Sequence, residues 1–70
     1  MEQEIRSYTA NGYTIKVIQY NDGGKIEYHV KHNFPSVPGG EWFKEHEKAK
    51  AIAEAQFFAW WIERQEGEQT

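Results

Sequence analysis

Two turn signals in the first half of the chain constrain its fold more than any other feature. They are Asn11-Gly12 and Asp22-Gly23-Gly24, and each lies between segments in which apolar and polar residues alternate. Asn-Gly favours the tight turn of a β-hairpin because both central residues of that turn need a positive φ. The pattern therefore predicts an antiparallel meander of three strands over residues 4–10, 13–20 and 25–32.

The first turn predicts one strand register, whereas the second allows two. With Asn11-Gly12 at the turn, three cross-strand pairs are expected: Tyr8 with Ile15, Arg6 with Val17, and Ile5 with Ile18. The second turn can close on Asp22-Gly23, which pairs Val17 with Tyr28, or on Gly23-Gly24, which shifts the partners by two residues. Both registers keep the same side chains on the same face, since strand side chains alternate with a period of two.

This alternation divides the strand residues between two faces. One face is apolar and is expected to form the core: Tyr8, Tyr13, Ile15, Val17, Ile26, Tyr28 and Val30. The other face is mainly polar: Ser7, Thr9, Thr14, Lys16, Lys25, Glu27, His29 and Lys31, with Ile5, Ile18 and Tyr20 among them. A sheet with one apolar face needs a second layer to cover that face.

The second half of the chain is expected to supply that layer. Residues 33–40 contain both prolines and a glycine pair and read as a loop, and residues 41–46 read as a short edge strand or as the entry to a helix. Helix-forming residues dominate from about residue 47 to 66, with Gly67 as the expected C-cap. A chain of 70 residues has room for one core. We therefore predict a single α+β domain over residues 1–70, in which a three- to four-stranded antiparallel meander packs against one C-terminal helix.

The segment QFFAWWIER, residues 56–64, places large rings around most of the helix circumference. A stripe of small and aliphatic residues with one ring gathers on one side: Ala51, Ile52, Ala55, Phe58, Ala59 and Ile62. Phe57 and Trp61 lie on nearly the opposite side, with Trp60 beside them. Either the stripe packs on the sheet and the Phe57-Trp61 pair faces outward, or the rings cover the sheet and the alanine-rich stripe is free for another helix.

These rings lead to the first functional hypothesis. Phe34, Val37, Trp42 and Phe43 could shield them, or the rings could remain as an apolar patch that binds another protein. Trp and Tyr are enriched at the energetic centres of protein interfaces. The predicted protein-binding residues are Phe57, Trp60, Trp61 and Trp42. The partner would be another protein, or a second copy of the chain in a homodimer.

The outer sheet face supports an alternative, a nucleic-acid-binding module. Its candidate residues combine cations that can contact phosphate with rings that can stack on a base: Lys16, Lys25, His29, Lys31 and Tyr20. A solvated face explains the same residues more simply, because Lys on exposed strands also discourages edge pairing. The net charge of −3 argues against nucleic acid for the chain as a whole.

No residue pattern indicates an enzyme. His29 and His32 should project to opposite faces of a strand and so cannot bind one metal ion together, and Ser7 and Ser36 lack a nucleophile motif. The carboxylates of Glu41, Glu45 and Glu47 read as a solvated helix start. We expect no catalytic residue, no metal and no cofactor.

The same sequence argues against a membrane or secreted protein. The longest apolar run, Phe57 to Ile62, is far shorter than the roughly 20 residues that span a bilayer. The N-terminal segment MEQEIRSYTA lacks the features of a signal peptide, and the chain has no cysteine. These features predict a soluble cytoplasmic protein.

The layout GYTIKVIQYNDGGKIEYHVKH followed by EHEKAKAIAEAQFFAWW resembles two kinds of protein. It is similar to the arm-type DNA-binding domain of phage integrases, through Gly12-Tyr13, Asp22-Gly23 and the helix start at Lys48 to Ala51. That resemblance implies DNA binding by a basic sheet face. In size, acidity and layout the chain also resembles small phage-encoded inhibitors of the anti-CRISPR type. This second resemblance implies a non-enzymatic protein-binding module of a phage or mobile element that occupies the surface of a partner, which would be a host or phage protein.

Overall fold

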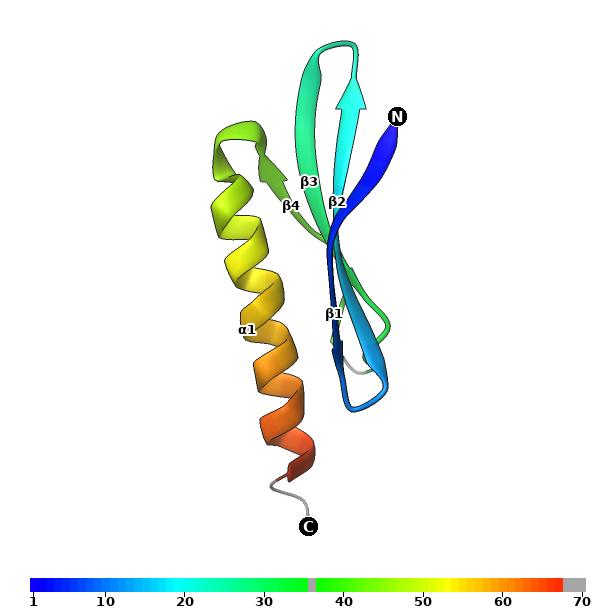
Figure 1. Ribbon diagram of the computed structural model, residues 1–70, viewed down its shortest axis with the longest axis vertical. Coiled ribbons are helices and arrows are strands. Elements are labelled where there is room, and N and C mark those ends of the chain that lie inside the picture. Colours follow the sequence, from blue (N-terminus) through cyan, green and yellow to red (C-terminus); the bar gives the residue numbers. More distant parts are fainter. Residues whose placement is uncertain (36, 68–70) are drawn as a thin grey trace.

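The computed structural model describes residues 1–35 and 37–67, which form a two-layer α+β domain (Figure 1). Four antiparallel strands make one sheet in the order β1-β2-β3-β4: β1 (Glu2–Ala10), β2 (Tyr13–Asp22), β3 (Lys25–His32) and β4 (Glu41–Lys44). A short 3₁₀ turn, η1 (Glu45–Glu47), leads into one helix, α1 (Lys48–Gly67). The predicted fold class is confirmed. The domain is elongated, with extents of 48 × 18 × 17 Å.

Both glycine turns have the backbone conformation that the sequence predicts. Asn11 and Gly12 have φ values of 52° and 86°, and Gly23 and Gly24 have φ values of 60° and 88°. The first hairpin pairs Tyr8 with Ile15 and Arg6 with Val17, as predicted. The second hairpin closes on Gly23-Gly24, so that Val17 lies opposite Val30. The structure thus selects one of the two registers that the second turn signal allowed.

The predicted pairing of Ile5 with Ile18 is wrong. Glu4 lies opposite Ile18 instead, because a β-bulge interrupts the register between Glu4 and Arg6. An extra residue on one strand changes which way the side chains before it point. Ile5 was expected on the outer face, but it is half-buried and packs against the core.

Residues 41–46, for which the sequence left two alternatives, begin as a strand. β4 pairs with the middle of β3, with Phe43 opposite Tyr28 and Trp42 opposite His29. Paired residues share a face of the sheet, so Phe43 joins the core while Trp42 lies on the outer face. The strand ends at Lys44, and the 3₁₀ turn takes up the remainder of the predicted segment.

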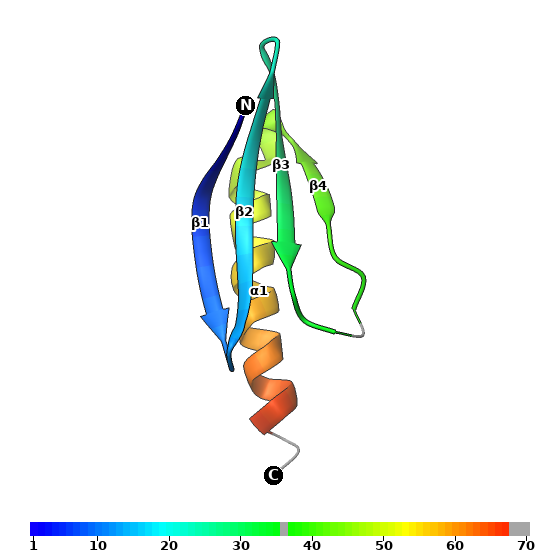
Figure 2. The ribbon, with the colours of Figure 1, turned by 90° about the vertical axis from the view of Figure 1, so that its right-hand side faces the viewer.

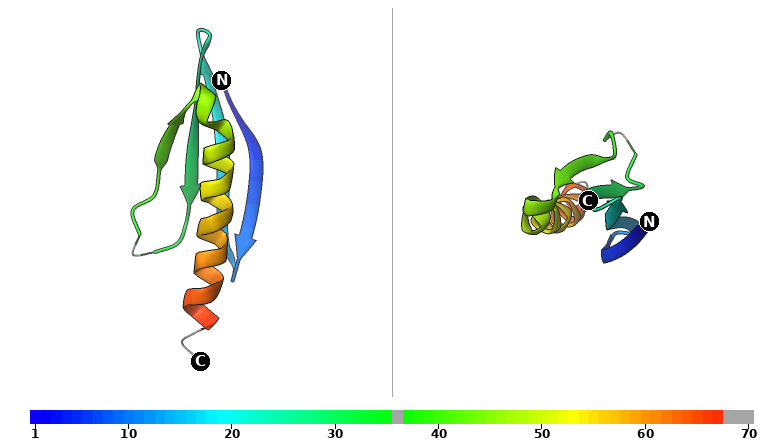
Figure 3. Two further views of the ribbon diagram at one scale, coloured as in Figure 1. Left: turned by 90° about the vertical axis from the view of Figure 1, so that its left-hand side faces the viewer. Right: turned by 90° about the horizontal axis from the view of Figure 1, so that it is seen from above.

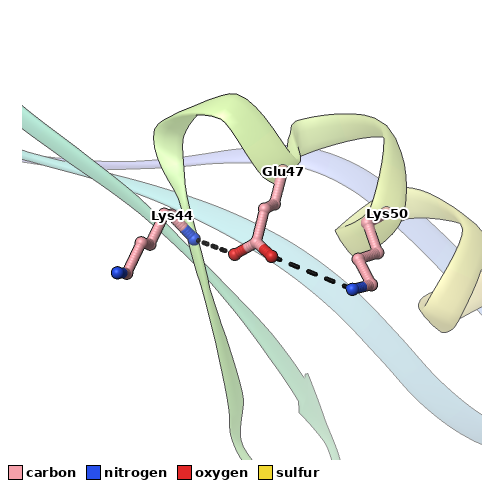
Figure 4. A network of polar contacts seen from close by, with 3 residues as sticks. All are labelled: Lys44, Glu47 and Lys50. Atoms are coloured by element: carbon pink, nitrogen blue, oxygen red, sulfur yellow. Dashed lines mark hydrogen bonds and ion pairs between the residues drawn. The ribbon is translucent and has the colours of Figure 1, made fainter.

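The start of the helical segment is defined by Glu47. Its carboxylate accepts a hydrogen bond of 2.9 Å from the backbone N–H of Lys44 and lies 3.9 Å from the ammonium of Lys50 (Figure 4). The hydrogen bond, with support from the nearby cations, lowers the pKa of Glu47 below its ordinary value. The carboxylate thereby satisfies a backbone donor at the point where strand gives way to helix. α1 begins at Lys48, one residue after the predicted start.

The core lies between the inner sheet face and one side of α1, which lies against that face, while the hairpin between β2 and β3 extends past the start of the helix (Figure 3). The sheet contributes Ile15, Val17, Tyr28, Val30 and Phe43, with Ala10 at the end of β1; the helix contributes Ala51, Ala55, Ala59 and Ile62. The small helical side chains allow the helix backbone to lie close to the branched and aromatic side chains of the strands. The structure therefore confirms that the small and aliphatic stripe of the helix packs on the sheet, as in the first of the two predicted orientations. Within residues 1–35 and 37–67, no helix has both the length and the apolar content that crossing a bilayer requires.

Candidate binding surfaces

The four predicted protein-binding residues do not form one surface. Phe57 and Trp60 lie together on the outer side of α1, with 56% and 51% of their surfaces exposed. Trp61 is half-buried beneath the loop, and Trp42 lies on the opposite layer of the molecule, on the outer sheet face. The structure therefore has two separate exposed aromatic groups, one on each layer.

We call Phe57 and Trp60 the helix patch. Their ring centroids are 5.7 Å apart, and the guanidinium of Arg64 lies 5.0 Å from the centroid of the Trp60 ring. The two rings point away from the sheet because residues 57 and 60 are rotated by roughly 150–210° from the centre of the buried stripe at about 100° per residue. The exposed alanines Ala49 and Ala53 continue the same side of the helix toward its start.

Trp61 does not form an exposed pair with Phe57, so that expectation from the sequence is wrong. Its ring stacks on Phe58, with centroids 5.7 Å apart and an interplanar angle of 12°. Phe34, from the loop after β3, meets Trp61 edge to face at 5.8 Å. The loop supplies a cover for one side of the helix, and this cover determines which of the adjacent tryptophans is exposed.

We call Tyr20, His29 and Trp42 the sheet platform. The rings of His29 and Trp42 are stacked, with centroids 4.2 Å apart and an interplanar angle of 3°. The ring of Tyr20 lies 5.1 Å from that of Trp42. Trp42 keeps 52% of its surface exposed. The strands β2, β3 and β4 each contribute one ring, so backbone pairing holds the three together.

His29 is held closely from the loop side. The backbone of Gly40, at φ 92°, lies so near the ring that a Cβ at this position would be 2.6 Å from His29 Nε2. Nδ1 of His29 is buried without a hydrogen-bond partner among the described residues. Burial lowers the pKa of His29, and the positive charge of Lys31 lowers it further. A neutral imidazole is therefore the form that stacks beneath Trp42 at neutral pH.

The phenol of Tyr20 interacts with Glu2 on the edge strand β1. Partial burial raises the pKa of Tyr20, and the Glu2 carboxylate, which bonds to the phenol and carries a negative charge, raises it further. Residue 2 lies directly opposite residue 20 in the β1–β2 register. The phenol of Tyr20 therefore remains protonated and neutral throughout the physiological range.

The predicted basic residues divide into two positions. Lys16 and Lys31 lie directly opposite each other on β2 and β3, the two central strands of the sheet. Lys16 forms an ion pair of 3.1 Å with Glu4. Lys25 begins β3 at the hairpin turn, and six residues along a strand place it roughly 20 Å from Lys31. The structure therefore brings Lys16, Lys31, His29 and Tyr20 into one region and separates Lys25 from them.

Two open hollows adjoin this region. One is lined by Thr14, Lys16, Lys31, His32 and Asn33; the other is lined by His29, Lys31, His32, Gly39, Gly40 and Trp42. They share Lys31 and His32, so together they follow the outer face from the platform to the lysine pair. The polar lining includes an amide, a hydroxyl and two ammonium groups, a set that suits an anion.

His29 and His32 project to opposite faces of β3, as strand alternation predicts. His29 stacks on Trp42 outside the sheet, whereas His32 lies 4.4 Å from the ring of Phe58 on the helix side. His32 Nδ1 accepts a hydrogen bond of 3.1 Å from the Phe34 N–H, and Nε2 lies 3.4 Å from the carbonyl of Pro38. His32 thus holds the loop in place. In the part of the chain that the structure describes, no three His, Asp or Glu side chains gather as they would around a metal ion.

Three features of these surfaces were not anticipated from the sequence. Trp42 belongs with Tyr20 and His29, a relation that depends on how β4 pairs with β3 after an irregular loop. Gly40 sits against His29, and Glu4 neutralises Lys16 across the bulge. The alternation of residues 41–44 would have suggested opposite faces for Trp42 and Phe43, but only the pairing shows which face each occupies.

Comparisons with known proteins add no family assignment. The chain matches no protein-family model, and no curated protein or solved structure shows significant similarity to it.

Proposed function

We propose that this chain is a non-enzymatic protein-binding module that uses the helix patch to occupy the surface of another protein. The observation that carries the proposal is the exposure of two neighbouring large rings, 56% for Phe57 and 51% for Trp60, on the side of α1 away from the sheet. Small soluble domains rarely leave adjacent rings in water unless those rings have a partner. Aromatic side chains also provide most of the binding energy at many interfaces.

The spacing along α1 indicates the chemistry of that partner. Ala49, Ala53, Phe57 and Trp60 follow one another at intervals of three or four residues on the outer side of the helix. A helix with anchors at this spacing suits an apolar groove about as wide as a helix. The partner we propose is therefore a protein with such a groove, deep enough to receive the two rings.

An inhibitory role is the form of this function that the layout supports. The size and the meander-then-helix arrangement resemble small phage-encoded inhibitors. A module of this kind acts by covering a surface that its target needs and requires no chemistry of its own. The target would be a host or phage protein.

A second copy of the chain is another candidate occupant of the helix patch. The first half of the outer side carries the small side chains of Ala49 and Ala53, and the second half carries the large rings of Phe57 and Trp60. In a two-fold antiparallel arrangement, the rings of one copy would lie over the alanines of the other. Sedimentation equilibrium of the purified protein distinguishes this arrangement from the binding of a different protein.

The test compares variants of the immobilised protein in a lysate of its source cells. Phe57→Ser combined with Trp60→Ser should abolish capture of the partner, while the circular dichroism spectrum and the urea melt remain those of the wild type. Trp42→Ser, which removes an equally exposed ring from the other layer, is the matched control and should retain the partner. If the double variant captures the same protein as strongly as the wild type, the helix patch is not the binding surface.

A further inference from the structure

We propose that the outer face of the sheet binds single-stranded nucleic acid, with a base stacked on Trp42 and a neighbouring phosphate held by Lys31 and Lys16. This site is independent of the helix patch, because it lies on the other layer of the molecule. Figure 2 shows the sheet from this side, with α1 behind the strands and no other described helix or strand in front of them.

The sheet platform is already arranged for stacking. One face of the Trp42 ring rests on His29 at 4.2 Å, nearly parallel, while half of the Trp42 surface remains open to solvent. Gly40 and Tyr20 hold the pair from two sides. A ring that its neighbours hold in place while half of its surface is exposed can receive a base without first being ordered, so little conformational entropy is lost on binding.

The lysine pair supplies the second part of the site. Like charges directly opposite each other on neighbouring strands are unfavourable. Glu4 neutralises Lys16, but among the described residues no carboxylate lies within ion-pair distance of Lys31. Protection of a sheet edge does not explain the pair, since the edges of this sheet are β1 and β4. An anion bound between the two ammonium groups would relieve the repulsion.

The two hollows connect these parts in the order that a nucleotide requires. The hollow beside Trp42 and His29 meets the hollow beside Lys16, Thr14 and Asn33 at Lys31. A base on the platform would therefore have its phosphate near Lys31, with the amide and hydroxyl groups beyond it. The aromatic and cationic features belong to one continuous track across β2, β3 and β4.

The open ring favours a single strand over a duplex. The faces of the bases in a duplex are covered by their neighbours, so they cannot stack on a protein ring, whereas single strands present them freely. Duplex binding would depend on the phosphates alone, and this face carries acids, Glu4 and Glu27, as well as lysines.

The test uses fluorescein-labelled oligothymidine of about ten nucleotides, a length within the usual site sizes for single strands. Fluorescence anisotropy measures its affinity at about 50 mM and 150 mM salt, with a duplex of the same length as competitor. We expect binding that weakens with salt, and competition by unlabelled single strand but not by duplex. No binding at the lower salt concentration, or equal competition by the duplex, would overturn the proposal.

Variants then identify the site. Trp42→Leu keeps apolar bulk over His29 but removes the stacking surface, and it should weaken binding roughly tenfold or more. Lys31→Gln should reduce the slope of log affinity against log salt by about 0.7. Glu4→Gln releases Lys16 from its ion pair at 3.1 Å and should strengthen binding. This gain cannot arise from loss of folding, so it keeps the test decisive if another variant is unstable.

Matched controls come from the helix layer. Trp60→Leu removes an equally exposed tryptophan, and Lys48→Gln removes an equal charge; both should bind the oligonucleotide as the wild type does. If Lys48→Gln weakens binding as much as Lys31→Gln does, the attraction is a general effect of charge and the site is wrong. An unchanged affinity in Trp42→Leu would rule out the stacked base.

Discussion

The inner and outer sides of α1 carry apolar residues of opposite size. The inner side is made of Ala51, Ala55 and Ala59 with Ile62, all buried, whereas the outer side carries Phe57 and Trp60, more than half exposed. Burying the larger side chains would remove more apolar surface from water. The sheet, however, already fills the space between the layers with its own branched and aromatic side chains, so only a helix with small inner residues can approach it closely. The inner side thus contributes to the core, and the outer rings remain exposed.

The largest expected effect tests the inner side. Ile62→Ala should lower the free energy of unfolding by about 2–5 kcal/mol, because the side chain is fully buried and its removal leaves a cavity. Phe57→Ala, the control on the outer side, should change it by no more than about 0.5 kcal/mol. Urea melts of the two variants measure both values. A larger loss in Phe57→Ala than in Ile62→Ala would show that the helix faces the other way.

A larger side chain also tests the difference between the inner and outer sides of α1. Ala55→Leu inserts a branched side chain where no surface is exposed, and we expect it to cost about 1–3 kcal/mol through overpacking against the sheet. Ala53→Leu makes the identical change on the outer side and should alter stability by about 0.5 kcal/mol or less. Thermal melts measure both variants. Equal Tm values for Ala55→Leu and Ala53→Leu would contradict close packing of α1 against the sheet.

Trp60 and Trp61 allow a finer test of the two sides of α1, because the first ring is exposed and the second is half-buried against Phe34. Trp61→Ala removes contacts with Phe58 and Phe34 and should cost about 1–2 kcal/mol. Trp60→Ala should have a smaller effect, since its ring contacts only Phe57 and Arg64 among the contacts that the structure gives. Equal losses in denaturant melts would mean that the loop does not distinguish the two rings.

The smallest expected effect concerns Glu47, whose carboxylate lies at the start of the helical segment. The hydrogen bond from the Lys44 N–H lowers the pKa of Glu47 below its ordinary value of 4.5, so the folded state favours the carboxylate. Its contribution to stability is therefore present above pH 4.5 and is lost as the pH falls through the lower pKa of the folded state. The Tm of Glu47→Gln should lie slightly below that of the wild type at pH 7.

Lowering the pH completes that measurement. The two Tm values should converge once the pH lies below the lowered pKa of Glu47 in the folded state, because the residue is then protonated in both states and resembles glutamine. Lys50→Gln removes the 3.9 Å ion pair but leaves the hydrogen bond, so it should change the Tm less than Glu47→Gln does. A constant difference between wild type and Glu47→Gln across the whole pH range would exclude this role for the carboxylate.

Much of the fold could be predicted because local signals agreed with one another. Asn11-Gly12 needs positive φ and lies between alternating segments, so turn chemistry and apolar pattern both select the pairing of Tyr8 with Ile15. The helix was placed to within a residue at each end by its composition and flanking signals. The second turn signal allowed two registers because Asp22-Gly23 and Gly23-Gly24 can both adopt the positive φ values that the two central residues of a tight turn need.

The candidate surfaces were less predictable because their parts come from distant segments. Which face Trp42 occupies depends on the pairing of β4 with β3, and the intervening loop of prolines and glycines does not specify a register. The bulge that turns Ile5 inward shows in the sequence only as an apolar residue on the predicted polar face, a feature that Ile18 and Tyr20 share without a bulge. Helical periodicity placed Phe57 and Trp61 together, but Phe34 arrives from the loop to cover one of them.

The sequence by itself determined the elements of this protein and the inner stripe of its helix, because periods of 2 and about 3.6 residues and positive-φ turns act between near neighbours along the chain. Only the tertiary structure decided which rings are exposed and which rings meet. Exposure is set by what covers a side chain, and here the covering groups, Phe34 over Trp61 and His29 beneath Trp42, lie far away in sequence. Long-range packing therefore decides which rings are exposed, while local chemistry decides which elements form.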